Sequence, residues 1–425
     1  MSSVEQQLIE TRRQAAGPML AVWSLVGAFG AYFCTYVFRK PFTAALYSGG
    51  SVWGIEEKAV LVTAQTLGYM AAKVVGIRVI AETPPERRAL GILILVGSAE
   101  TALLLFGLAP SPLHVLCLFA NGLSLGLVFG LVIGFLEGRR STEALAAGLC
   151  ASFILADGVA KSIGTWLLGR GIDERWMPGV AGLLFFPPLL FFVGVLARIP
   201  PPDDRDVALR GKRSAMGSGD RAALVRRHGF GLLMLVAAYF LVTIARSLRA
   251  DFAPEVWRAL GIDAAPSTFA SSEILVALLV LVANGLSVLI LDNRRAFFTA
   301  IGVALAGGLL MLVALVGQRQ SWLDGFTFMV LLGTGLYLPY VAIHTTIFER
   351  LIAMTRGRSN LGFLMYVADS AGYLGYAGLM LAKGALPTGR SFMGFFSATC
   401  GIVAVLTCLS LAMSWGYFAR RGDEK

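Results

Sequence analysis

Long apolar runs recur along the whole chain, and short polar segments separate them. A run of about 20 predominantly apolar residues has the length that an α-helix needs to cross the hydrocarbon core of a bilayer. We predict twelve such spans, with the approximate bounds 18–47, 58–81, 89–109, 113–136, 144–168, 177–197, 229–250, 268–291, 297–316, 326–348, 361–382 and 392–418. The pattern therefore predicts an all-α integral membrane protein with twelve transmembrane helices.

The composition of the chain supports this class. Of its 425 residues, 56% are hydrophobic and 15% are charged, and the mean hydropathy is +0.73. No water-soluble fold needs so apolar a composition. The first apolar run is too long for a signal peptide and lacks a small-residue cleavage site, so we expect no cleaved leader.

The sequence gives no sign of a metal, a cofactor or an enzyme active site. The five cysteines lie within apolar runs and no Cys-x-x-Cys pair occurs, so neither a disulfide framework nor a metal site is predicted. The three histidines form no metal-binding pattern, and we expect His344 to be a hydrogen-bonded core residue. No Gly-rich phosphate loop, nucleophile elbow or pair of catalytic carboxylates is present, so we expect neither an enzyme nor direct driving by ATP.

The positive charge of the chain follows the predicted topology. The net charge is +10, which in a soluble protein could indicate nucleic-acid binding. With the N-terminus placed inside, 22 lysines and arginines fall in cytoplasmic segments and 7 fall in external loops. Cytoplasmic loops of membrane proteins carry such an excess. We therefore expect a multi-pass protein of the bacterial inner (plasma) membrane with both termini in the cytoplasm, and no nucleic-acid partner.

One long polar segment divides the predicted spans into six and six. Residues 198–228 combine proline, mixed charge and Gly-Ser content, which is typical of a flexible linker. We therefore predict an N-terminal six-helix bundle (1–197), a cytoplasmic linker (198–228) and a C-terminal six-helix bundle (229–425). Transporters are commonly built from two such bundles related by an axis along the membrane normal.

Matching residues in the two bundles support a duplicated unit. Arg39 of the first span corresponds to Arg246 of the seventh, and Asp157 of the fifth corresponds to Asp369 of the eleventh. The loops that correspond are Glu137–Ser141 with Arg356–Ser359, and Arg87–Arg88 with Asp292–Arg295. Together these matches predict that helix n of one bundle is equivalent to helix n + 6 of the other.

Two adjacent cations, Arg39 and Lys40, fall inside the apolar stretch Ala31–Tyr47. A cation near the bilayer centre costs about 2.5–3.5 kcal/mol on insertion scales, so it is kept only where it faces a protein interior or a watery cavity. The alternative is that Arg39 marks the end of a shorter helix. We favour the longer helix because Thr43–Tyr47 continues in mostly apolar residues before Gly49–Gly50. The other cations inside predicted spans are Lys73, Arg78, Lys161, Arg246 and Arg249.

Four short motifs resemble those of one transporter family. Residues 32–42, which read Tyr-Phe-Cys-Thr-Tyr-Val-Phe-Arg-Lys-Pro-Phe, resemble the first-helix signature of the organophosphate:phosphate antiporter family of the major facilitator superfamily. Leu67–Lys73 is similar to its second-helix pattern, in which a tyrosine precedes a lysine by four residues. Arg246 is followed by Asp251 and Pro254, as in its seventh helix, and Gly372–Gly375 resembles its Gly-Tyr-Leu-Gly sequence in helix eleven. The resemblance implies the major facilitator fold, with twelve helices in two pseudo-symmetric bundles.

The resemblance also implies a binding site. In that family the two matching arginines, here Arg39 and Arg246, bind the phosphate group from the two halves of a site at the membrane midplane. A guanidinium presents a planar fork of donors that suits phosphate or carboxylate, and it stays protonated. Lys73 and Tyr69 lie four residues apart on one helix face and would add a charge and a hydroxyl. Packing alone is the alternative role for Tyr69.

The chain departs from the family in helix five, where Asp157 stands in place of a histidine and Lys161 follows one turn on. An aspartate there would repel a phosphate unless it is protonated or paired with a cation. Because seven cations inside the spans outnumber the four evident buried acids, we expect Asp157 and Asp369 to be ionised and paired. The pairings that we consider are Asp157 with Lys161, Lys40 or Lys73, and Asp369 with Arg39 or Arg246.

A few other residues complete the predicted site and its scaffold. Glu273 in helix eight is another buried acid, whereas Glu100 in helix three is expected to belong to the scaffold or to face outward. Tyr337 in helix ten is expected to shape the pocket. The glycines that repeat every fourth residue in helix four, which predict close helix packing, are Gly122, Gly126 and Gly130.

The leading function is secondary transport of a small organic anion, expected to be phosphorylated, by alternating access of one central site. The anion would exchange against phosphate or be coupled to protons. Two alternatives stay open: proton symport of an uncharged or zwitterionic solute with Asp157 and Asp369 titrating, and a transporter-shaped sensor that binds solute without turnover. The expected partners are the anionic solute and the lipid bilayer, and we expect a monomer.

Overall fold

The computed structural model describes residues 3–136, 142–200, 218–288, 290–355, 361–385 and 392–421. The corresponding loops Glu137–Ser141 and Arg356–Ser359 and most of the predicted linker therefore lie outside the described residues. The side chain of Arg78 also lies outside them.

The described part of the chain is almost entirely helical. The N-terminal part contains α1 (Ser3–Val37), η1 (Pro41–Ala44), β1 (Ser51–Val52), β2 (Ile55–Glu56), α2 (Glu57–Glu82), α3 (Pro85–Leu108), α4 (His114–Leu125), α5 (Val128–Leu136), α6 (Thr142–Gly169) and α7 (Met177–Ala197). The C-terminal part contains α9 (Ser218–Asp251), α10 (Ala253–Ala259), α11 (Pro266–Val288), α12 (Asn293–Arg319), α13 (Gly325–Ala342), η2 (Ile343–Ile347), α14 (Phe348–Thr355), α15 (Leu361–Ala385) and α16 (Phe392–Arg421).

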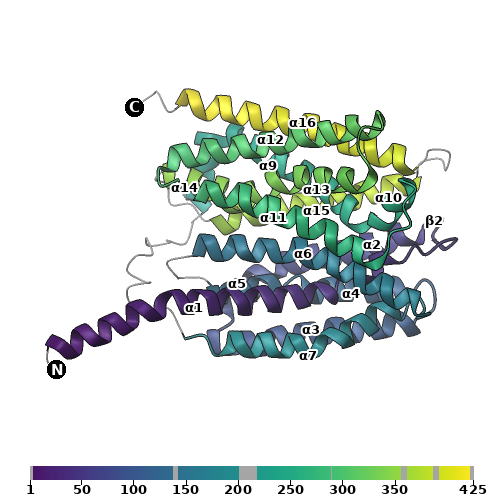
Figure 1. The fold of residues 1–425 in the computed structure, drawn as a ribbon, viewed down its shortest axis with the longest axis horizontal. Helices are drawn as coiled ribbons and strands as arrows, with labels where there is room; N and C mark the ends of the chain where they lie inside the picture. The colour runs from purple at the N-terminus through teal and green to yellow at the C-terminus, as the bar shows by residue number, and fades with distance from the viewer. Residues whose placement is uncertain are drawn as a thin grey trace.

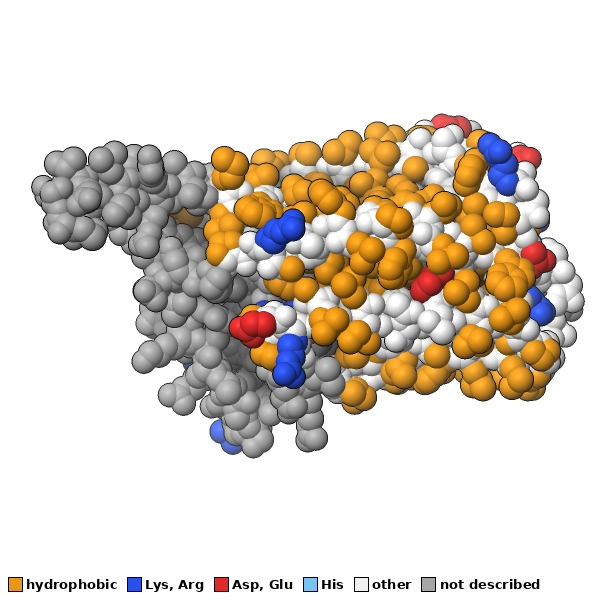
Figure 2. Space-filling model, turned by 90° about the horizontal axis from the view of Figure 1, so that it is seen from below, with side chains coloured by type: hydrophobic (Ala, Val, Ile, Leu, Met, Phe, Trp, Pro, Cys, Tyr) orange, Lys and Arg blue, Asp and Glu red, His pale blue; other side chains and the backbone are white. Residues whose placement is uncertain are grey.

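Each of the twelve predicted spans overlaps one helix or a few consecutive helices. Within the described residues, nine helical segments are long and apolar enough to cross a membrane. The side surface of the molecule agrees with this, because hydrophobic side chains dominate the face seen in Figure 2. The protein is an all-α integral membrane protein with several membrane-spanning helices.

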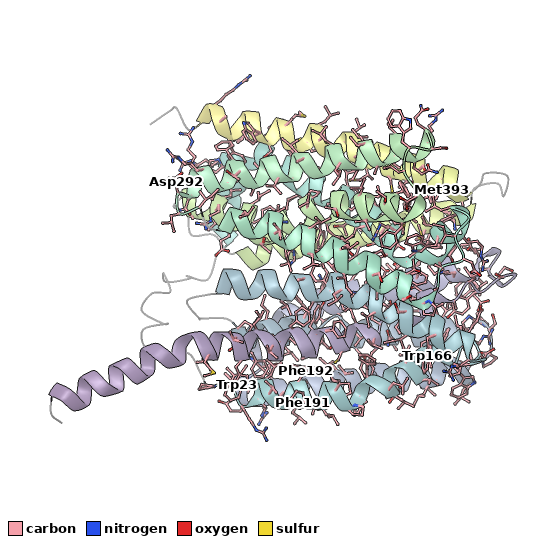
Figure 3. The ribbon with its side chains drawn as sticks, viewed as in Figure 1. Trp23, Trp166, Phe191, Phe192, Asp292 and Met393 are labelled. Atoms are coloured by element: carbon pink, nitrogen blue, oxygen red, sulfur yellow. The ribbon has the colours of Figure 1, made fainter. Side chains whose placement is uncertain are left out.

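The helices of the two parts lie on opposite sides of the molecule, with α1 to α7 below and α9 to α16 above in Figure 1. The start of α1 and the end of α16 lie at the same end, on the left, which we call the terminal end. The β1–β2 hairpin and α10 lie at the opposite end, which we call the hairpin end. Figure 3 shows Trp23 and Asp292 towards the terminal end and Trp166 and Met393 towards the hairpin end.

Among the described residues, two helix pairs make the most extensive contacts between the N-terminal part and the C-terminal part. Helix α2 packs against α15, and α6 packs against α11. We call these contacts the α2–α15 seam and the α6–α11 seam.

Small residues set the distances between neighbouring helices. A Cβ at Gly122 would lie 2.1 Å from the carbonyl oxygen of Gln65, and one at Gly126 would lie 2.5 Å from the Cβ of Ala72, so α4 packs directly on the backbone of α2. The predicted role of these two glycines in close packing is confirmed. In the same way Gly30 of α1 makes room for the ring of Phe192, which is labelled in Figure 3.

The first span differs from its prediction. Helix α1 ends at Val37, so Arg39 and Lys40 follow its end instead of lying within a helix over 18–47, and a short 3₁₀ turn begins at Pro41. Proline lacks the amide donor that a continuing helix needs, and it disfavours the helical conformation of the residue before it. The apolar character of the residues after Pro41 reflects burial of this segment, and it does not reflect helix length.

Three other elements depart from the expected bounds. The fourth span is interrupted between α4 and α5, and the tenth contains the π-helical segment η2. Helix α9 begins at Ser218, inside the predicted linker, and kinks at His228. The hairpin of β1 and β2 was not predicted because each strand has only two residues.

Candidate functional site

Helix α15 shows how the buried polar residues are arranged between the two ends of the molecule. Asp369, Tyr373 and Tyr376 lie on one face of this helix because four and three residues separate them. At a rise of about 1.5 Å per residue, the first and the last are about 10 Å apart along the axis. The three side chains contact three different groups of residues, which we call the terminal-end network, the central cluster and the hairpin-end cluster.

The central cluster begins with two arginines that stack on tyrosine rings. The guanidinium carbon of Arg39 lies 3.9 Å from the ring centroid of Tyr69, and that of Arg246 lies 4.5 Å from the centroid of Tyr340. All four side chains are buried. Cation–π contacts of this kind contribute about 2 kcal/mol when they are desolvated. The rings thus hold both cations in the interior without neutralising their charge.

The two arginines face common neighbours, Tyr36 and Tyr373. The Arg39 guanidinium carbon lies 5.8 Å from the Tyr36 centroid and 6.0 Å from the Tyr373 centroid, and Arg246 interacts electrostatically with both phenols. Neither arginine has a carboxylate within ion-pair distance among the described residues, and the Nε of each lacks a hydrogen-bond partner there. Because buried charges are costly unless they are paired, the two guanidinium groups can accept an anion.

Two buried amide side chains hold the backbone beneath Arg39. The Nε2 of Gln65 donates to the carbonyl of Arg39 at 2.9 Å and to the Oδ1 of Asn121 at 2.8 Å. The Nδ2 of Asn121 in turn donates to the carbonyls of Phe38 and Ala99 at 3.0 and 3.1 Å. The end of α1 leaves carbonyl groups without helical partners, and these two side chains satisfy two of them.

Arg246 is held in a different way, because α9 continues without interruption from Arg246 to Asp251. Its helix packs closely on the Gly-Tyr-Leu-Gly motif of α15. A Cβ at Gly372 would lie 2.8 Å from side-chain atoms of Thr243, and one at Gly375 would lie 2.4 Å from the ring of Phe240. The glycines of this motif therefore bring α15 and its Tyr373 close to α9.

The terminal-end network joins the two parts across the α2–α15 seam. The ammonium group of Lys73 forms an ion pair with Asp369, whose other carboxylate oxygen accepts a hydrogen bond from the hydroxyl of Tyr239. The same hydroxyl lies 3.3 Å from the Nδ1 of His344. His344 belongs to the π-helical segment η2, and the prediction that it is a hydrogen-bonded core residue is confirmed. Segments of π-helix occur frequently at functional sites.

The hairpin-end cluster also joins the two parts. Lys40, just after α1, forms an ion pair with Asp251 at the end of α9, and the hydroxyl of Tyr376 donates to the same carboxylate at 2.9 Å. Lys58 of α2 pairs with Glu255 of α10 at 2.5 Å. These buried pairs occupy the space between the parts on the hairpin side of the central cluster.

Four further buried charges surround a small cavity beside the α6–α11 seam. Lys161 pairs with Asp157 one turn away on α6 at 2.5 Å, and Arg249 pairs with Glu273 of α11 at 2.8 Å. One oxygen of each carboxylate has no protein partner among the described residues. All four side chains line a cavity of about 10 Å³, which is the size of one water molecule.

The predicted site residues therefore fall into separate groups. Arg39, Arg246, Tyr69 and Tyr337 belong to the central cluster, Lys73 and Asp369 to the terminal-end network, Lys40 to the hairpin-end cluster, and Asp157, Lys161 and Glu273 to the small cavity. Of the pairings considered for Asp157, the structure selects Lys161.

One expected pairing was wrong, and one open alternative is resolved. Asp369 pairs with Lys73 and with neither arginine, because the α2–α15 contact brings the lysine to it. Of the two alternatives for Glu100, the structure favours the scaffold: this residue is only 5% exposed, and a Cβ at Gly182 of α7 would lie 1.9 Å from its Oε2. The missing side chain of Gly182 provides the space that the Glu100 carboxyl group occupies.

Sequence reasoning missed several residues of these groups. Gln65 and Asn121 are polar residues inside apolar runs, and that alone could have identified them. Tyr373 and Asp251 were present in the motifs, and Tyr373 is paired at helical spacing with Tyr376. Lys58 gave no such signal, because it stands at the start of a predicted span.

Comparisons with known proteins agree with this architecture. A family model described as "Family of unknown function (DUF5690)" matches residues 41–421. A search of curated proteins finds no match. Among solved structures, 237 chains match.

Two of the matching structures illustrate the fold. A crystal structure described as a D-xylose-proton symporter matches with a TM-score of 0.61 and 15% identity, covering 92% of this chain and 96% of that chain. A partially occluded inward-open structure of the xylose transporter XylE from E. coli matches with a TM-score of 0.58 and 15% identity, covering 92% and 95%. At this level of identity the likeness shows the fold, which is of the major facilitator type.

Proposed function

The chain belongs to the family of unknown function DUF5690, and we propose that it is a secondary transporter of a small organic anion with two negative charges. A phosphorylated solute is the leading candidate. The solute binds in the central cluster between Arg39 and Arg246, and it exchanges against phosphate or moves together with protons.

The charge balance of the interior carries this proposal. Among the buried lysines and arginines whose side chains are described, Lys40, Lys58, Lys73, Lys161 and Arg249 each form an ion pair with a carboxylate. Arg39 and Arg246 form none. The central cluster therefore has two uncompensated positive charges, which a dianion such as a phosphate ester would balance.

The arrangement also supports alternating access between two six-helix bundles. Residues 1–197 would form one bundle and residues 229–425 the other, and the ion pairs that join them would break and re-form as the bundles rock. The excess of lysine and arginine in the predicted cytoplasmic segments supports an orientation with both chain ends in the cytoplasm of a bacterial inner membrane. On this orientation the hairpin-end cluster closes the site towards the outside.

Proton symport of a neutral or zwitterionic solute is the second candidate. One observation favours it: both carboxylate oxygens of the buried Glu100 lack a partner among the described residues. An isolated buried carboxyl group is more stable protonated than ionised. One of the solved structures with this fold is described as a D-xylose-proton symporter, and proton symport is consistent with a buried carboxyl group of this kind.

The test is exchange in liposomes that contain the purified full-length protein. Labelled inorganic phosphate and a labelled sugar phosphate are offered from outside against the same unlabelled compound inside. We expect Arg39→Lys and Arg246→Lys each to reduce exchange about tenfold to a hundredfold, because the charge is kept while hydrogen bonds to a charged group worth about 1.5–3 kcal/mol are lost.

Arg170→Lys is the matched control, because Arg170 also stacks on an aromatic ring, Trp166, but lies exposed at the surface. It should exchange like the unmodified protein. Near-normal exchange by both Arg39→Lys and Arg246→Lys would refute the two-arginine site. Uptake of an uncharged sugar that depends on a pH gradient and is lost in Glu100→Gln would favour the symport candidate.

A further inference from the structure

A groove on the outer surface of the molecule runs along the last three turns of α16. It has a volume of about 600 Å³, and its lining consists of Phe230 of α9 together with Leu409, Ala412, Met413, Gly416, Tyr417 and Arg420 of α16. Arg420 is the charged residue of this lining, and the other lining residues are four apolar residues, one glycine and one tyrosine. The groove is separate from the central cluster, which lies in the interior between the two parts.

The groove has the shape of a site for an extended chain. Its lining residues on α16 follow the spacing of one helix face, and the distance from Leu409 to Arg420 is about 16 Å along the axis. Both helices that form it are candidate membrane spans, so this face meets the hydrocarbon region. No atom lies within 4 Å of the position where Gly416 would carry a Cβ, which leaves the middle of the groove open to an acyl chain.

Two arginines stand where the groove reaches the terminal end. Arg420 lines the groove, and Arg226 lies four residues before Phe230 in α9, on the other side of the kink at His228. The hydroxyl of Tyr417 donates to the carbonyl of Arg227 at 3.0 Å, so this part of α16 touches α9 directly beside Arg226. Arg226 and Arg420 are exposed, and neither has a carboxylate within ion-pair distance among the described residues.

We propose that this groove is a binding site for an anionic phospholipid. One acyl chain lies along the apolar face of α16 over Gly416, and the headgroup phosphate accepts hydrogen bonds from Arg226 and Arg420 at the membrane–water boundary. A basic pair beside an apolar groove at the end of membrane-spanning helices matches the two chemical halves of such a lipid. A lipid with a zwitterionic headgroup matches the groove but gains less from the two charges.

The experiment is native mass spectrometry of the purified full-length protein titrated with dioleoyl phosphatidylglycerol or dioleoyl phosphatidylcholine. These two lipids have identical acyl chains and differ in headgroup charge. We expect tighter binding of phosphatidylglycerol by the unmodified protein. Arg226→Gln and Arg420→Gln should each weaken it about fivefold, as expected for loss of one cation near a lipid surface. They should weaken phosphatidylcholine binding less, because the choline cation of that lipid already offsets the charge of its phosphate.

Two further variants separate the groove from general surface charge. Arg295→Gln removes an exposed arginine at the start of α12, near the terminal end but outside the groove. It should not change the binding of either lipid. Gly416→Leu fills the groove on an exposed helix face and should weaken both lipids. Equal binding of the two lipids by the unmodified protein, or an equal loss in Arg295→Gln, would overturn the proposal.

Discussion

Where α2 meets α15, the buried Lys73 of the N-terminal part pairs with Asp369 of the C-terminal part. In the same seam the ring centroids of Tyr69 and Tyr373 are 5.4 Å apart. Where α6 meets α11, Asp157 and Glu273 find their cations within their own parts. That seam depends instead on close packing, because a Cβ at Gly158 would lie 2.7 Å from the carbonyl oxygen of Phe269.

This difference shows that the two seams respond to different changes. A buried ion pair is sensitive to any group that offers one of its members another partner, and removing one member leaves an uncompensated charge. A contact between two helix backbones has no such alternative partner, and it changes only when the helices move apart. We therefore expect a bound anion to act on the α2–α15 seam, through Lys73, while the α6–α11 seam keeps its packing.

The largest effect is expected from breaking the pair in the α2–α15 seam. Lys73→Met should lower the free energy of unfolding by about 3–5 kcal/mol, because Asp369 is left buried without its cation. Adding Asp369→Asn should recover most of this loss, since the double variant has no uncompensated charge. Thermal unfolding in detergent measures both.

The partly exposed pair Lys383–Glu56 provides the control for this test, because its ammonium and carboxylate groups are 2.8 Å apart and the two side chains are 17% and 45% exposed. Lys383→Met should cost about 0–1 kcal/mol. If the double variant at the seam is as unstable as Lys73→Met alone, the ion pair does not explain the seam.

A smaller effect is expected from widening the α6–α11 seam with Gly158→Ala. The added methyl group would meet the Phe269 carbonyl and the Glu273 side chain at 2.7 Å, and such overpacking costs about 1–3 kcal/mol. Gly378→Ala on α15 is the matched control, because nothing lies within 4 Å of its Cβ position. There the higher helix propensity of alanine should stabilise the protein by up to about 1 kcal/mol. If Gly158→Ala lowers and Gly378→Ala raises the stability in a thermal unfolding assay, the packed seam is supported. A stabilising Gly158→Ala contradicts it.

The smallest effect is expected at Ser162, whose Oγ accepts a hydrogen bond from the backbone amide of Ala270 across the α6–α11 seam at 3.1 Å. Ser162→Ala should cost about 1 kcal/mol, the usual contribution of one hydrogen bond. Ser98→Ala removes an exposed hydroxyl that bonds only to a carbonyl of its own helix, and it should change the free energy of unfolding by less. Equal losses in the two variants would mean that the bond across the seam adds nothing.

The class of protein and the fold could be predicted because the bilayer imposes them on the sequence. A chain in hydrocarbon must satisfy its backbone hydrogen bonds internally, so spanning helices appear as apolar runs of fixed length. After Pro41 an apolar run does not indicate a longer helix, because burial between helices produces the apolar run without producing a helix.

The pairing of charges was less predictable. A pair within one helix, such as Asp157 with Lys161, follows from spacing alone. The partner of Asp369 depends on which helix of the N-terminal part faces α15, and single-sequence patterns do not contain that information. The amide groups of Gln65 and Asn121 act on backbone carbonyls exposed by the break in α1, so their role becomes visible only once the break is known.

In the buried ion pairs between the two parts, the N-terminal part contributes the cation and the C-terminal part contributes the acid. This arrangement affects how the chain is inserted as it is synthesised. Lys40, Lys58 and Lys73 belong to the N-terminal part, and the acids that neutralise them arrive later, on α9, α10 and α15. As the N-terminal part emerges from the ribosome first, the carboxylates that pair with these three lysines are not yet in the membrane. The lysines must remain in contact with water until the later helices are inserted, and Lys73 waits until α15, close to the end of translation.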